Sequence, residues 1–414
     1  MTHYVFLGGL YPKEQEKELF KLCKGRLSFA ANKHQWNMVE GLEENIGSPV
    51  TLINTFFIPP FPACKKKVFQ TEFWSHADTA EDINIGFLNV RWIRNIWQEN
   101  GVYRTLKSLL QKNKEDKTVV FVYTMRFCLM KAIVRLKKAG FDFHVCLIVP
   151  DVPSVLMNYG GRKSLLQQIT ARYNLSHVNR YTEQMDSFVL LSEPMTELVD
   201  IGNRPYCIVD GLCNSEMIAN LSCASEETSN KKRIVYTGSL HREYGICDLL
   251  EAFRCLSGDD YQLIVAGAGN AVEDVWDACH ADGRITYLGT LRAEDVRSLQ
   301  ASATILINPR PIDGLDAKYS FPSKTIEYML AGKPVVMNRL PGMDIAYEKY
   351  VFTPQKCGCQ GLGETIEYVC SLPQEDIERI TKAARQFVVD EKNSAVQMKR
   401  VMDMVSDSTS LFEV

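Results

Sequence analysis

The stretch INPRPIDGLDAKYSFPSKTIEYMLAGKPVV, Ile307–Val336, carries the clearest structural pattern in the chain. Its residues predict a strand, a long loop, a short helix, a tight turn and a second strand. Pro322 suits the start of the helix, because its missing N–H would have no intrahelical partner there. Gly332 suits the position just past the helix, and Pro334 prevents the helix from continuing. The stretch therefore predicts one strand–helix–strand unit of a parallel sheet.

The polar residues of this predicted helix lie on the face that turns away from its apolar positions. Ser323, Lys324 and Glu327 share that face, and the first two stand in the first turn. A helix N-terminus carries free N–H groups and a charge of about +0.5, so it favours phosphate. Lys324 adds a full positive charge, and Glu327 can accept hydrogen bonds from a sugar diol. The face predicts a site for a nucleotide diphosphate and its ribose. The alternative is a surface helix with a Lys324–Glu327 ion pair worth about 0.2–0.5 kcal/mol.

Short β-branched runs alternate with amphipathic stretches along the whole chain, which indicates an α/β fold with parallel sheets covered by helices. Strands are expected at Tyr4–Leu7, Thr118–Tyr123, His144–Val149, Ser187–Leu191, Arg233–Tyr236, Tyr261–Ala266, Ile285–Leu288, Thr304–Ile307 and Pro334–Met337. Helices are expected at Val102–Gln111, Arg126–Ala139, Leu249–Leu256, Val272–Ala281, Ala293–Ala301 and Ser323–Ala331. The weakly apolar segment 214–232 separates the two halves and predicts a linker. Two doubly wound domains facing across a cleft are the simplest architecture, with the cleft as the expected site.

Composition excludes several classes of protein. The 414 residues are 46% hydrophobic and 23% charged, with a net charge of −3, so wholesale disorder is excluded. No apolar run approaches the roughly 18–20 residues of a membrane span, and the N-terminal residues lack a signal-peptide pattern. The 13 scattered cysteines fit reduced thiols in a cytoplasm. The near-neutral charge predicts that nucleic acid is not a partner.

Metal-binding patterns are absent from the sequence. No Asp-x-Asp triplet occurs, and no His, Cys and carboxylate cluster has the spacing of metal ligands. Lysine, arginine and a helix dipole are therefore expected to stabilise a leaving diphosphate. No metal and no cofactor is predicted, and the nucleotide-activated sugar is expected only as a substrate.

The Ile307–Val336 stretch resembles the C-terminal motif of family-four retaining glycosyltransferases, in the variant group with an SFPSKTxEYMxxGKPVV donor motif. The resemblance implies the GT-B fold, with two Rossmann-like domains and a cleft between them. Glu327 matches the second glutamate of the family motif, which binds the nucleotide ribose. The position of the first glutamate holds Tyr319, and the loop that is usually Gly-Phe-Gly is Ser320–Pro322.

The resemblance continues upstream in VYTGSLHREYGICDLLEAF, Val235–Phe253, which is similar to the strand, loop and helix that open the family's donor domain. The family's diphosphate-binding arginine and lysine are replaced here by Ser239 and Tyr244. We expect Arg310 and Lys324 to supply the positive charge instead. A structural ion pair is the alternative for Arg310.

The resemblance implies three domain-level expectations. Residues 1–213 form an acceptor-side domain, and residues 233–391 form the nucleotide-sugar donor domain. The stretch Ala384–Val405 is similar to the family's crossing helix, so a C-terminal helix at about 392–414 is expected to pack back on the first domain. A set of donor-binding residues follows from the same resemblance, with Thr290 and Leu291 as base contacts. The set is Gly8, Gly9, Gly238, Ser239, Thr290, Leu291, Arg310, Ser320, Phe321, Pro322, Ser323, Lys324, Thr325 and Glu327.

Asp151 is the candidate for the reaction centre in the acceptor half, and Lys324 and Glu327 complete the predicted catalytic set. Asp151 follows an apolar run in CLIVPDVPS, where family members carry a histidine or an acid near the sugar. An Asx cap of a turn is the alternative. Gly8 and Gly9 directly follow the first strand and are expected to border the donor phosphates, with an ordinary turn as the alternative.

Two basic amphipathic stretches, Arg126–Lys138 and Arg162–Arg180, are typical of solvated helix faces and also of surfaces that contact anionic membranes. The expected location is therefore the cytoplasm, with peripheral contact at the inner face of the cell membrane as an option.

The function expected from these features is that of an enzyme, a retaining glycosyltransferase of the hexosyltransferase type. It would move a sugar from a UDP or GDP type donor to a saccharide or lipid-linked acceptor in bacterial polysaccharide or glycolipid assembly. A front-face mechanism without a metal or an enzymatic nucleophile fits the residues. Two alternatives stay open: a catalytically degenerate nucleotide-sugar-binding protein, and a sugar-nucleotide epimerase of the same fold.

Overall fold

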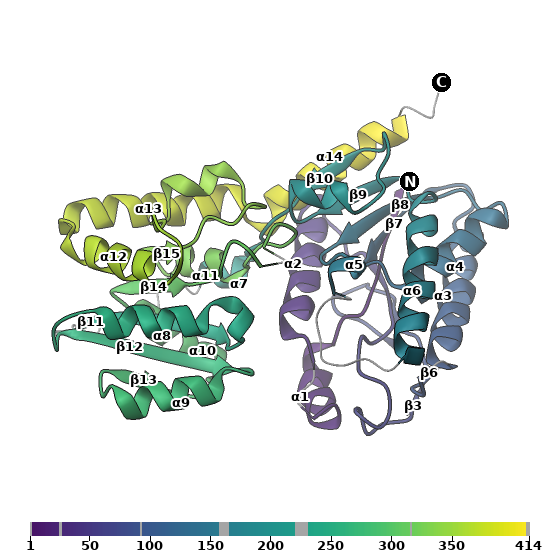
Figure 1. The fold of residues 1–414 in the computed structure, drawn as a ribbon. Coiled ribbons are helices and arrows are strands. Elements are labelled where there is room, and N and C mark those ends of the chain that lie inside the picture. Colours follow the sequence, from purple (N-terminus) through teal and green to yellow (C-terminus); the bar gives the residue numbers. More distant parts are fainter. Residues whose placement is uncertain are drawn as a thin grey trace. The chain divides into compact units, whose positions relative to one another are not determined.

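The computed structural model describes residues 2–24, 27–91, 93–156, 165–219, 231–314 and 317–410, with side chains left out at 165–171, 409 and 410. The chain divides into two compact units (Figure 1). The first unit is Met1–Val209 with Ser394–Val414, and the second is Asp210–Asn393. The chain thus crosses from one unit to the other twice.

The first unit contains an eight-stranded sheet in the order β10-β9-β8-β7-β1-β2-β5-β4. All neighbouring strands are parallel except β4 and β5, which run antiparallel. The strands of this sheet are β1 (Thr2–Gly8), β2 (Thr51–Asn54), β4 (Glu72–Trp74), β5 (Asp82–Asn84), β7 (Lys117–Tyr123), β8 (His144–Val149), β9 (Ser187–Leu190) and β10 (Tyr206–Ile208). A separate antiparallel pair is formed by β3 (Val68–Phe69) and β6 (Phe87–Leu88).

Helices cover both faces of this sheet (Figure 1). On one face α2 packs along α14, and on the other α3, α4 and α6 pack in sequence. The helices of the unit are α1 (Lys13–Leu22), α2 (Phe29–Ile46), α3 (Ile93–Lys112), α4 (Phe127–Lys138), α5 (Pro153–Leu156), α6 (Leu165–Thr182) and α14 (Ser394–Ser410), with a 3-10 turn, η1, at Glu193–Glu197. The central strands β7 and β8 are almost continuously buried because both of their faces are covered.

The second unit contains a five-stranded parallel sheet in the order β13-β12-β11-β14-β15. The strands are β11 (Lys232–Ser239), β12 (Tyr261–Ala268), β13 (Ile285–Tyr287), β14 (Ile305–Asn308) and β15 (Val335–Met337). The helices are α7 (Ser215–Ala219), α8 (Ile246–Cys255), α9 (Val272–Ala281), α10 (Ala293–Ala301), α11 (Lys324–Leu330), α12 (Gly358–Ser371) and α13 (Gln374–Glu391), with 3-10 turns η3 at Arg242–Tyr244 and η4 at Ile345–Lys349.

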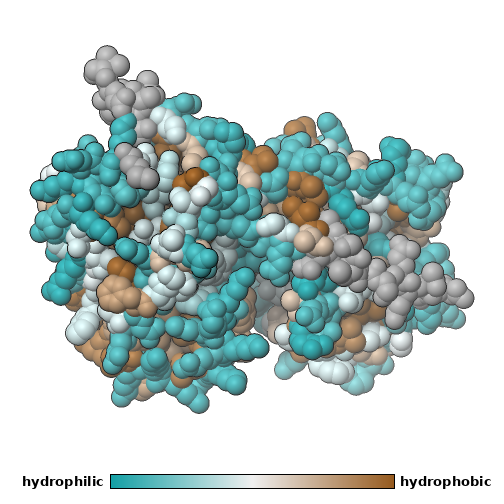
Figure 2. Space-filling view, turned by 180° about the vertical axis from the view of Figure 1, so that it is seen from behind, coloured by the Kyte–Doolittle hydropathy of each residue, from teal (hydrophilic) through white to brown (hydrophobic). Residues whose placement is uncertain are grey.

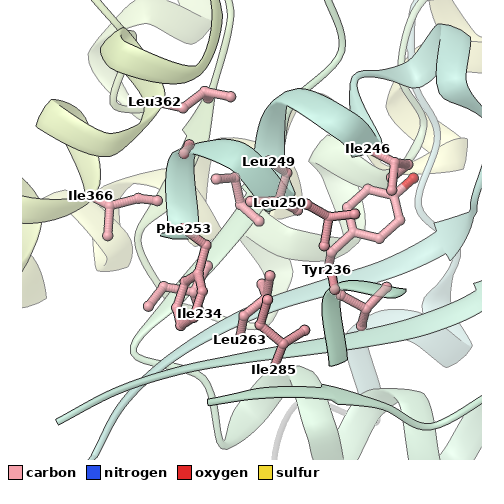
Figure 3. Packing of buried hydrophobic residues seen from close by; sticks show 14 of the residues in the cluster. Ile234, Tyr236, Ile246, Leu249, Leu250, Phe253, Leu263, Ile285, Leu362 and Ile366 are labelled. Carbon is pink, nitrogen blue, oxygen red and sulfur yellow. The ribbon is translucent and has the colours of Figure 1, made fainter. Parts of the chain in front are cut away.

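Two apolar clusters lie on the two faces of this sheet. Ile234 and Tyr236 of β11 pack with α8, α9 and α12 on one face, and Figure 3 shows the α8 side chains between the sheet and α12. Val235, the residue between them, packs with α11 and α13 on the other face. The alternation follows from the two-residue period of a strand, which sends successive side chains to opposite faces.

The expected strands and most of the expected helices occur within a few residues of their predicted bounds, whereas the helix expected at Val102–Gln111 is part of α3, which already begins at Ile93. The predicted α/β class with parallel sheets is confirmed. No element was predicted between residues 8 and 101, where α1, α2 and five short strands lie. The predicted linker 214–232 overlaps α7 and the first residue of β11, and residues 220–230 lie outside the described part.

The prediction of one helix over Ala384–Val405 was wrong. The structure has two helices there, α13 and α14, and the break falls at Lys392 and Asn393. Asn393 Nδ2 donates to the Val389 carbonyl at 2.7 Å, and the Lys392 carbonyl accepts from Cys213 N at 2.9 Å. These two bonds use groups at the end of α13 that a continuous helix would need. The second of these helices, α14, packs along α2 in the first unit.

A buried histidine connects α2 to the strand β5 in the first unit. His76 Nδ1 lies 2.6 Å from an oxygen of Asp82, and Nε2 lies 2.7 Å from an oxygen of Glu43. The His76 side chain is 6% exposed. Burial lowers the pKa of His76, but the hydrogen bonds to the two carboxylates outweigh burial and raise the pKa to about 9. The imidazole is therefore held as a cation at neutral pH.

This arrangement predicts a pH dependence of stability. The folded pKa of His76 exceeds its ordinary 6.5, so the stabilisation is complete below pH 6.5 and is lost as the pH rises through about 9. Urea unfolding of His76→Gln, measured between those pH values, should show a flatter pH dependence than the wild type. His280→Gln, at an exposed position, is the control. Equal slopes for the wild type and His76→Gln would contradict the prediction.

The surface is mostly hydrophilic on the face shown in Figure 2, with apolar side chains in scattered groups. Among the residues that the structure describes, no helix is long and apolar enough to cross a membrane.

Candidate functional site

The strand order of the second unit places a topological switch point at β11. The next strand in sequence, β12, lies on one side of β11, and β14 lies on the other. In such sheets ligands bind beyond the carboxyl ends of the strands where the order reverses. Beyond β11 lies the loop that contains Leu240, and β14 leads into Pro309 and Arg310. The predicted donor residues Gly238, Ser239 and Arg310 are thus brought to one edge of the sheet.

Backbone segments approach each other closely at this edge because two glycines lack side chains. Gly238 has φ +140° and Gly267 has φ +144°, a region that L side chains rarely adopt. A β-carbon at Gly238 would overlap the side chain of Lys324, and one at Gly267 would overlap the Gly238 carbonyl. Gly267 N also donates to the Gly289 carbonyl at 2.7 Å. The loop after β13, which holds the predicted base contacts, is thereby fixed beside β12.

Lys324 lies across Gly238 at the start of α11. Its helix is held on the sheet by Tyr328, whose hydroxyl oxygen accepts from Thr237 N at 3.0 Å. Lys324 Nζ lies 5.4 Å from the centre of the Tyr236 ring. The hydroxyl of Tyr236 donates to the Ser239 carbonyl at 2.7 Å, which holds the ring in place. The ring of Tyr236 is therefore fixed beside the ammonium group of Lys324.

The ammonium group of Lys324 has no anionic partner in the described part of the chain. Lys324 is half-buried and forms no hydrogen bond or salt bridge with a described residue. The Lys324–Glu327 ion pair, which was the alternative prediction for this helix, is therefore not formed. Burial lowers the pKa of Lys324 to about 8, and the positive charge of Arg310 adds to this effect while Glu327 opposes it. The site thus holds a cation in surroundings that favour binding an anion.

Arg310 lies close enough to Lys324 to affect its charge. The Arg310 guanidinium donates to Ser320 Oγ at 2.9 Å and lies 5.2 Å from the centre of the Tyr244 ring. The ring of Tyr244 therefore lies beside a second cation. The Asn308 Nδ2 at the end of β14 is buried and has no hydrogen-bond partner in the described residues. Two cations and a buried donor thus gather around the switch point.

The remaining predicted donor residues divide by exposure. Ser239, Thr290 and Ser323 are exposed, while Ser320, Leu291 and Glu327 are half-buried. Phe321 packs in the core against Tyr347, with ring centres 5.2 Å apart, and Thr325 is fully buried. The buried side chains of Phe321, Pro322 and Thr325 shape the loop, so any contact with a ligand would come from their backbone.

The predicted residues Gly8, Gly9 and Asp151 belong to the first unit. Gly8 ends β1, and Gly9 N donates to Gln35 Oε1 at 2.9 Å. Asp151 is exposed and follows β8. Its negative charge adds to burial in raising the pKa of Tyr123 at the end of β7. Tyr123 in turn contacts His34 Nδ1 at 3.0 Å through its hydroxyl.

His34 and Tyr236 were not among the predicted site residues. Each lies inside an element, and the resemblance of the Val235–Phe253 stretch assigned no role to Tyr236. Tyr236 could have been found from its position three residues before the end of a strand that enters the site. His34 offered no such signal. Burial lowers the pKa of His34 to about 4, so its imidazole is neutral. No group of three or more potential metal ligands occurs among the described residues.

Replacement of Gly238 by alanine should disturb this site. The new side chain would require a strained φ and would displace Lys324. We expect a loss of about 1–3 kcal/mol in the free energy of unfolding. Gly283→Ala, where nothing lies within 4 Å of the added carbon, should change stability by less than about 0.5 kcal/mol. Chemical denaturation of both variants tests the prediction, and equal effects would refute it.

Two units, each with a mainly parallel sheet covered by helices, have the architecture of the GT-B class of α/β fold. Residues 231–389, within the second unit, match the family model described as "Glycosyl transferases group 1". No curated protein matches the chain.

Solved structures of the same class match along almost the whole chain. A sucrose-phosphate synthase from Thermosynechococcus elongatus is 14% identical with a TM-score of 0.66, and the match covers 98% of this chain and 100% of that one. A UDP-forming α,α-trehalose-phosphate synthase from Burkholderia xenovorans is 12% identical with a TM-score of 0.65, covering 97% and 100%. A glycosyltransferase from Rickettsia africae is 13% identical with a TM-score of 0.62, covering 98% and 99%. At these identities the likeness concerns the fold.

Proposed function

We propose that this protein is a retaining glycosyltransferase that moves a hexose from a nucleoside diphosphate sugar, of the UDP or GDP type, to a hydroxyl of an acceptor. The observation that carries the proposal is the half-buried Lys324, which has no anionic partner among the described residues and lies over Gly238 at the switch point. The position of this site within the glycosyl transferases group 1 segment supports the same function.

In the proposed reaction, the diphosphate lies against Lys324 and Arg310, and the ribose hydroxyls donate to Glu327. The bond between the anomeric carbon and the phosphate oxygen breaks while the acceptor oxygen attacks from the same face. The acceptor proton passes to the departing phosphate oxygen, so no enzymatic nucleophile is needed. Preorganised cations at the developing negative charge lower the barrier without reorganising during the reaction. No metal and no cofactor takes part in this proposed reaction, in which the nucleotide sugar is a substrate.

The descriptions of two similar solved structures support the class of substrate. The Burkholderia xenovorans synthase is described as UDP-forming and was solved with glucose-6-phosphate. Another similar structure is described in terms of glycosyl transfer with retention. For this chain we propose a saccharide or lipid-linked acceptor in bacterial polysaccharide or glycolipid assembly, at the cytoplasmic side of the cell membrane.

The donor is tested by thermal-shift measurements with UDP, GDP, ADP and CMP. A nucleotide at about 100 times its Kd should add about 2.7 kcal/mol of stability, which is enough to raise Tm by several degrees. One nucleoside diphosphate is expected to stabilise the protein. Stabilisation by none of them, with or without magnesium, would refute the proposed function.

A nucleotide-sugar-binding protein without transferase activity is a second candidate. Tyr319 and Ser239 stand where the family has a glutamate and an arginine, and this observation favours the alternative. The measurement that separates the two is slow hydrolysis of the donor sugar in the absence of an acceptor. A protein that binds the nucleotide but leaves the sugar donor intact, both with water and with offered acceptors, would be a binding protein.

A further inference from the structure

The first unit contains a cavity of about 310 Å3 on the side of the sheet covered by α3, α4 and α6. Its lining comes from the starts of α3 and α4, from α5 and from the middle of α6. The polar lining residues are Arg94, Asn95, Arg126 and Asn174. Apolar side chains, among them Met125 and Leu175, complete the wall. A volume of this size lies at the lower end of the roughly 300–1,000 Å3 typical of small-molecule sites.

Two arginines give this cavity its charge. Arg94 and Arg126 are both half-buried, and no described residue that lines the cavity is a carboxylate. Arg94 donates to the Ile58 carbonyl at 2.8 Å. The Arg126 guanidinium lies 4.1 Å from the centre of the Phe57 ring. The segment Phe57–Ile58 thus holds both guanidinium groups, and neither forms an ion pair with a described carboxylate.

The two guanidinium groups affect each other electrostatically. Burial, followed by the positive charge of Arg126, lowers the pKa of Arg94 to about 10. Two other half-buried arginines of this protein do have a carboxylate partner: Arg135 pairs with Glu99 and Arg284 pairs with Asp282. Two neighbouring arginines without such a partner favour a bound anion, because an anion would offset their repulsion and accept bidentate hydrogen bonds.

The cavity lies beside the switch point of the first unit. In that sheet β1 has β2 on one side and β7 on the other, and Arg126 follows β7 by three residues. Between them stands Thr124, a β-branched residue with φ +73°, an unusual conformation that clusters at functional sites. Phe127 and Cys128, the first residues of α4, line the cavity, so the positive end of the helix dipole faces it.

We propose that this cavity binds the phosphate group of a phosphorylated acceptor, with Arg94 and Arg126 as the phosphate ligands. Only the role of the ligand as an acceptor rests on the proposed transferase function. The phosphate site itself consists of residues of the first unit alone. Asn95 and Asn174 offer polar contacts to hydroxyl groups, and the apolar wall suits the face of a sugar ring. A phosphate monoester of this kind occurs in a soluble sugar phosphate and in a phospholipid head group.

Binding of radiolabelled inorganic phosphate, measured by equilibrium dialysis, tests the site. The full-length Lys324→Met variant is used throughout, because it removes one of the two cations of the proposed donor site, and every arginine variant is compared within this background. This variant should bind phosphate. Adding Arg94→Gln or Arg126→Gln should weaken the affinity about tenfold or more, since each removes a charge-assisted hydrogen-bond donor. Arg94→Lys, which keeps the charge, should retain part of the affinity.

Arg104→Gln is the matched control, since Arg104 is exposed on the same helix as Arg94 and does not line the cavity. It should leave phosphate binding unchanged. Circular dichroism of each variant verifies that the protein is folded. Absence of phosphate binding in Lys324→Met, or equal binding in the folded Arg94→Gln, Arg126→Gln and Arg104→Gln variants, would overturn the proposal.

Two further measurements distinguish the sources of the phosphate. Glucose 6-phosphate should compete with labelled phosphate where glucose does not, if the acceptor is a soluble sugar phosphate. Phosphatidylcholine vesicles should bind the protein only when they contain phosphatidic acid, and only with both arginines present, if the acceptor is a phospholipid. Competition by glucose 6-phosphate that requires Arg94 and Arg126, or vesicle binding that requires them, supports the phosphate site. Competition or vesicle binding that persists in Arg94→Gln and in Arg126→Gln contradicts it.

Discussion

Lys324→Met is expected to abolish nucleotide binding and to lower kcat by about 100- to 1,000-fold, as removal of one preorganised donor does in other enzymes. The folded protein should nevertheless become no less stable. Burial holds the pKa of Lys324 near 8, so the charged form is disfavoured in the fold. Methionine keeps the aliphatic stem over Gly238 and Tyr236 and removes the charge. Loss of activity together with an equal or higher Tm is typical of a functional residue.

The pH dependence gives an independent readout of the same residue. The folded pKa of about 8 lies below the ordinary 10.5, so the unfolded chain binds more protons between these values and stability rises with pH there. This rise should be smaller in Lys324→Met. In the wild type, kcat/KM should fall above about pH 8 as the ammonium loses its proton.

Lys382→Met is the matched control for both measurements. Lys382 is exposed on α13 in the same unit and should affect neither binding nor the pH dependence. A Lys324→Met variant that keeps wild-type kcat and nucleotide affinity would remove the basis of the proposed donor site.

Lys392→Met is expected to cause the largest loss of stability. Lys392 Nζ lies 2.9 and 3.1 Å from the two carboxylate oxygens of Asp210, and the side chains are only 8% and 5% exposed. The rings of Tyr347 and Phe387 lie 4.9 and 5.4 Å from the same ammonium. Removing one partner leaves a buried carboxylate without its cation, which costs about 3–5 kcal/mol. Urea unfolding, followed for the second unit, measures this loss.

An exposed pair of the same type provides the control. Lys399 lies 3.3 Å from Asp403 on α14, with exposures of 66% and 60%, and Lys399→Met should cost less than about 0.5 kcal/mol. The double variant Asp210→Leu/Lys392→Met should regain much of the loss, since it leaves no buried charge uncompensated. Equal effects of Lys392→Met and Lys399→Met would show that burial does not determine the worth of these pairs.

The strands of the second unit and its helices α8 to α11 were predictable because their signals are local, whereas no helix was predicted at α7 or α12. The proline and glycine positions around α11 mark its two ends, and Gly332 has the left-handed φ of +69° expected just past a helix. The short strands β2 to β6 were not predictable. Each spans only two to four residues, too few for a two-residue period to emerge from the sequence. The C-terminal helix was expected from about residue 392, and α14 begins at Ser394. The bond to Cys213 at the break between α13 and α14 was not predictable, because Cys213 lies far away in the chain.

The amino-acid sequence by itself determined the α/β class and placed Lys324, Glu327 and Arg310 in one loop–helix segment, since all three lie within eighteen residues. The surroundings of these three residues depend on long-range packing, which local sequence patterns do not specify. Tyr236 and Gly238 are about ninety residues away in sequence and reach Lys324 through the strand order, which puts β11 beside β14. Arg94 and Arg126 meet for the same reason, on helices that follow different strands. Local patterns specify elements, whereas burial and charge at a site depend on which elements become neighbours in the sheet.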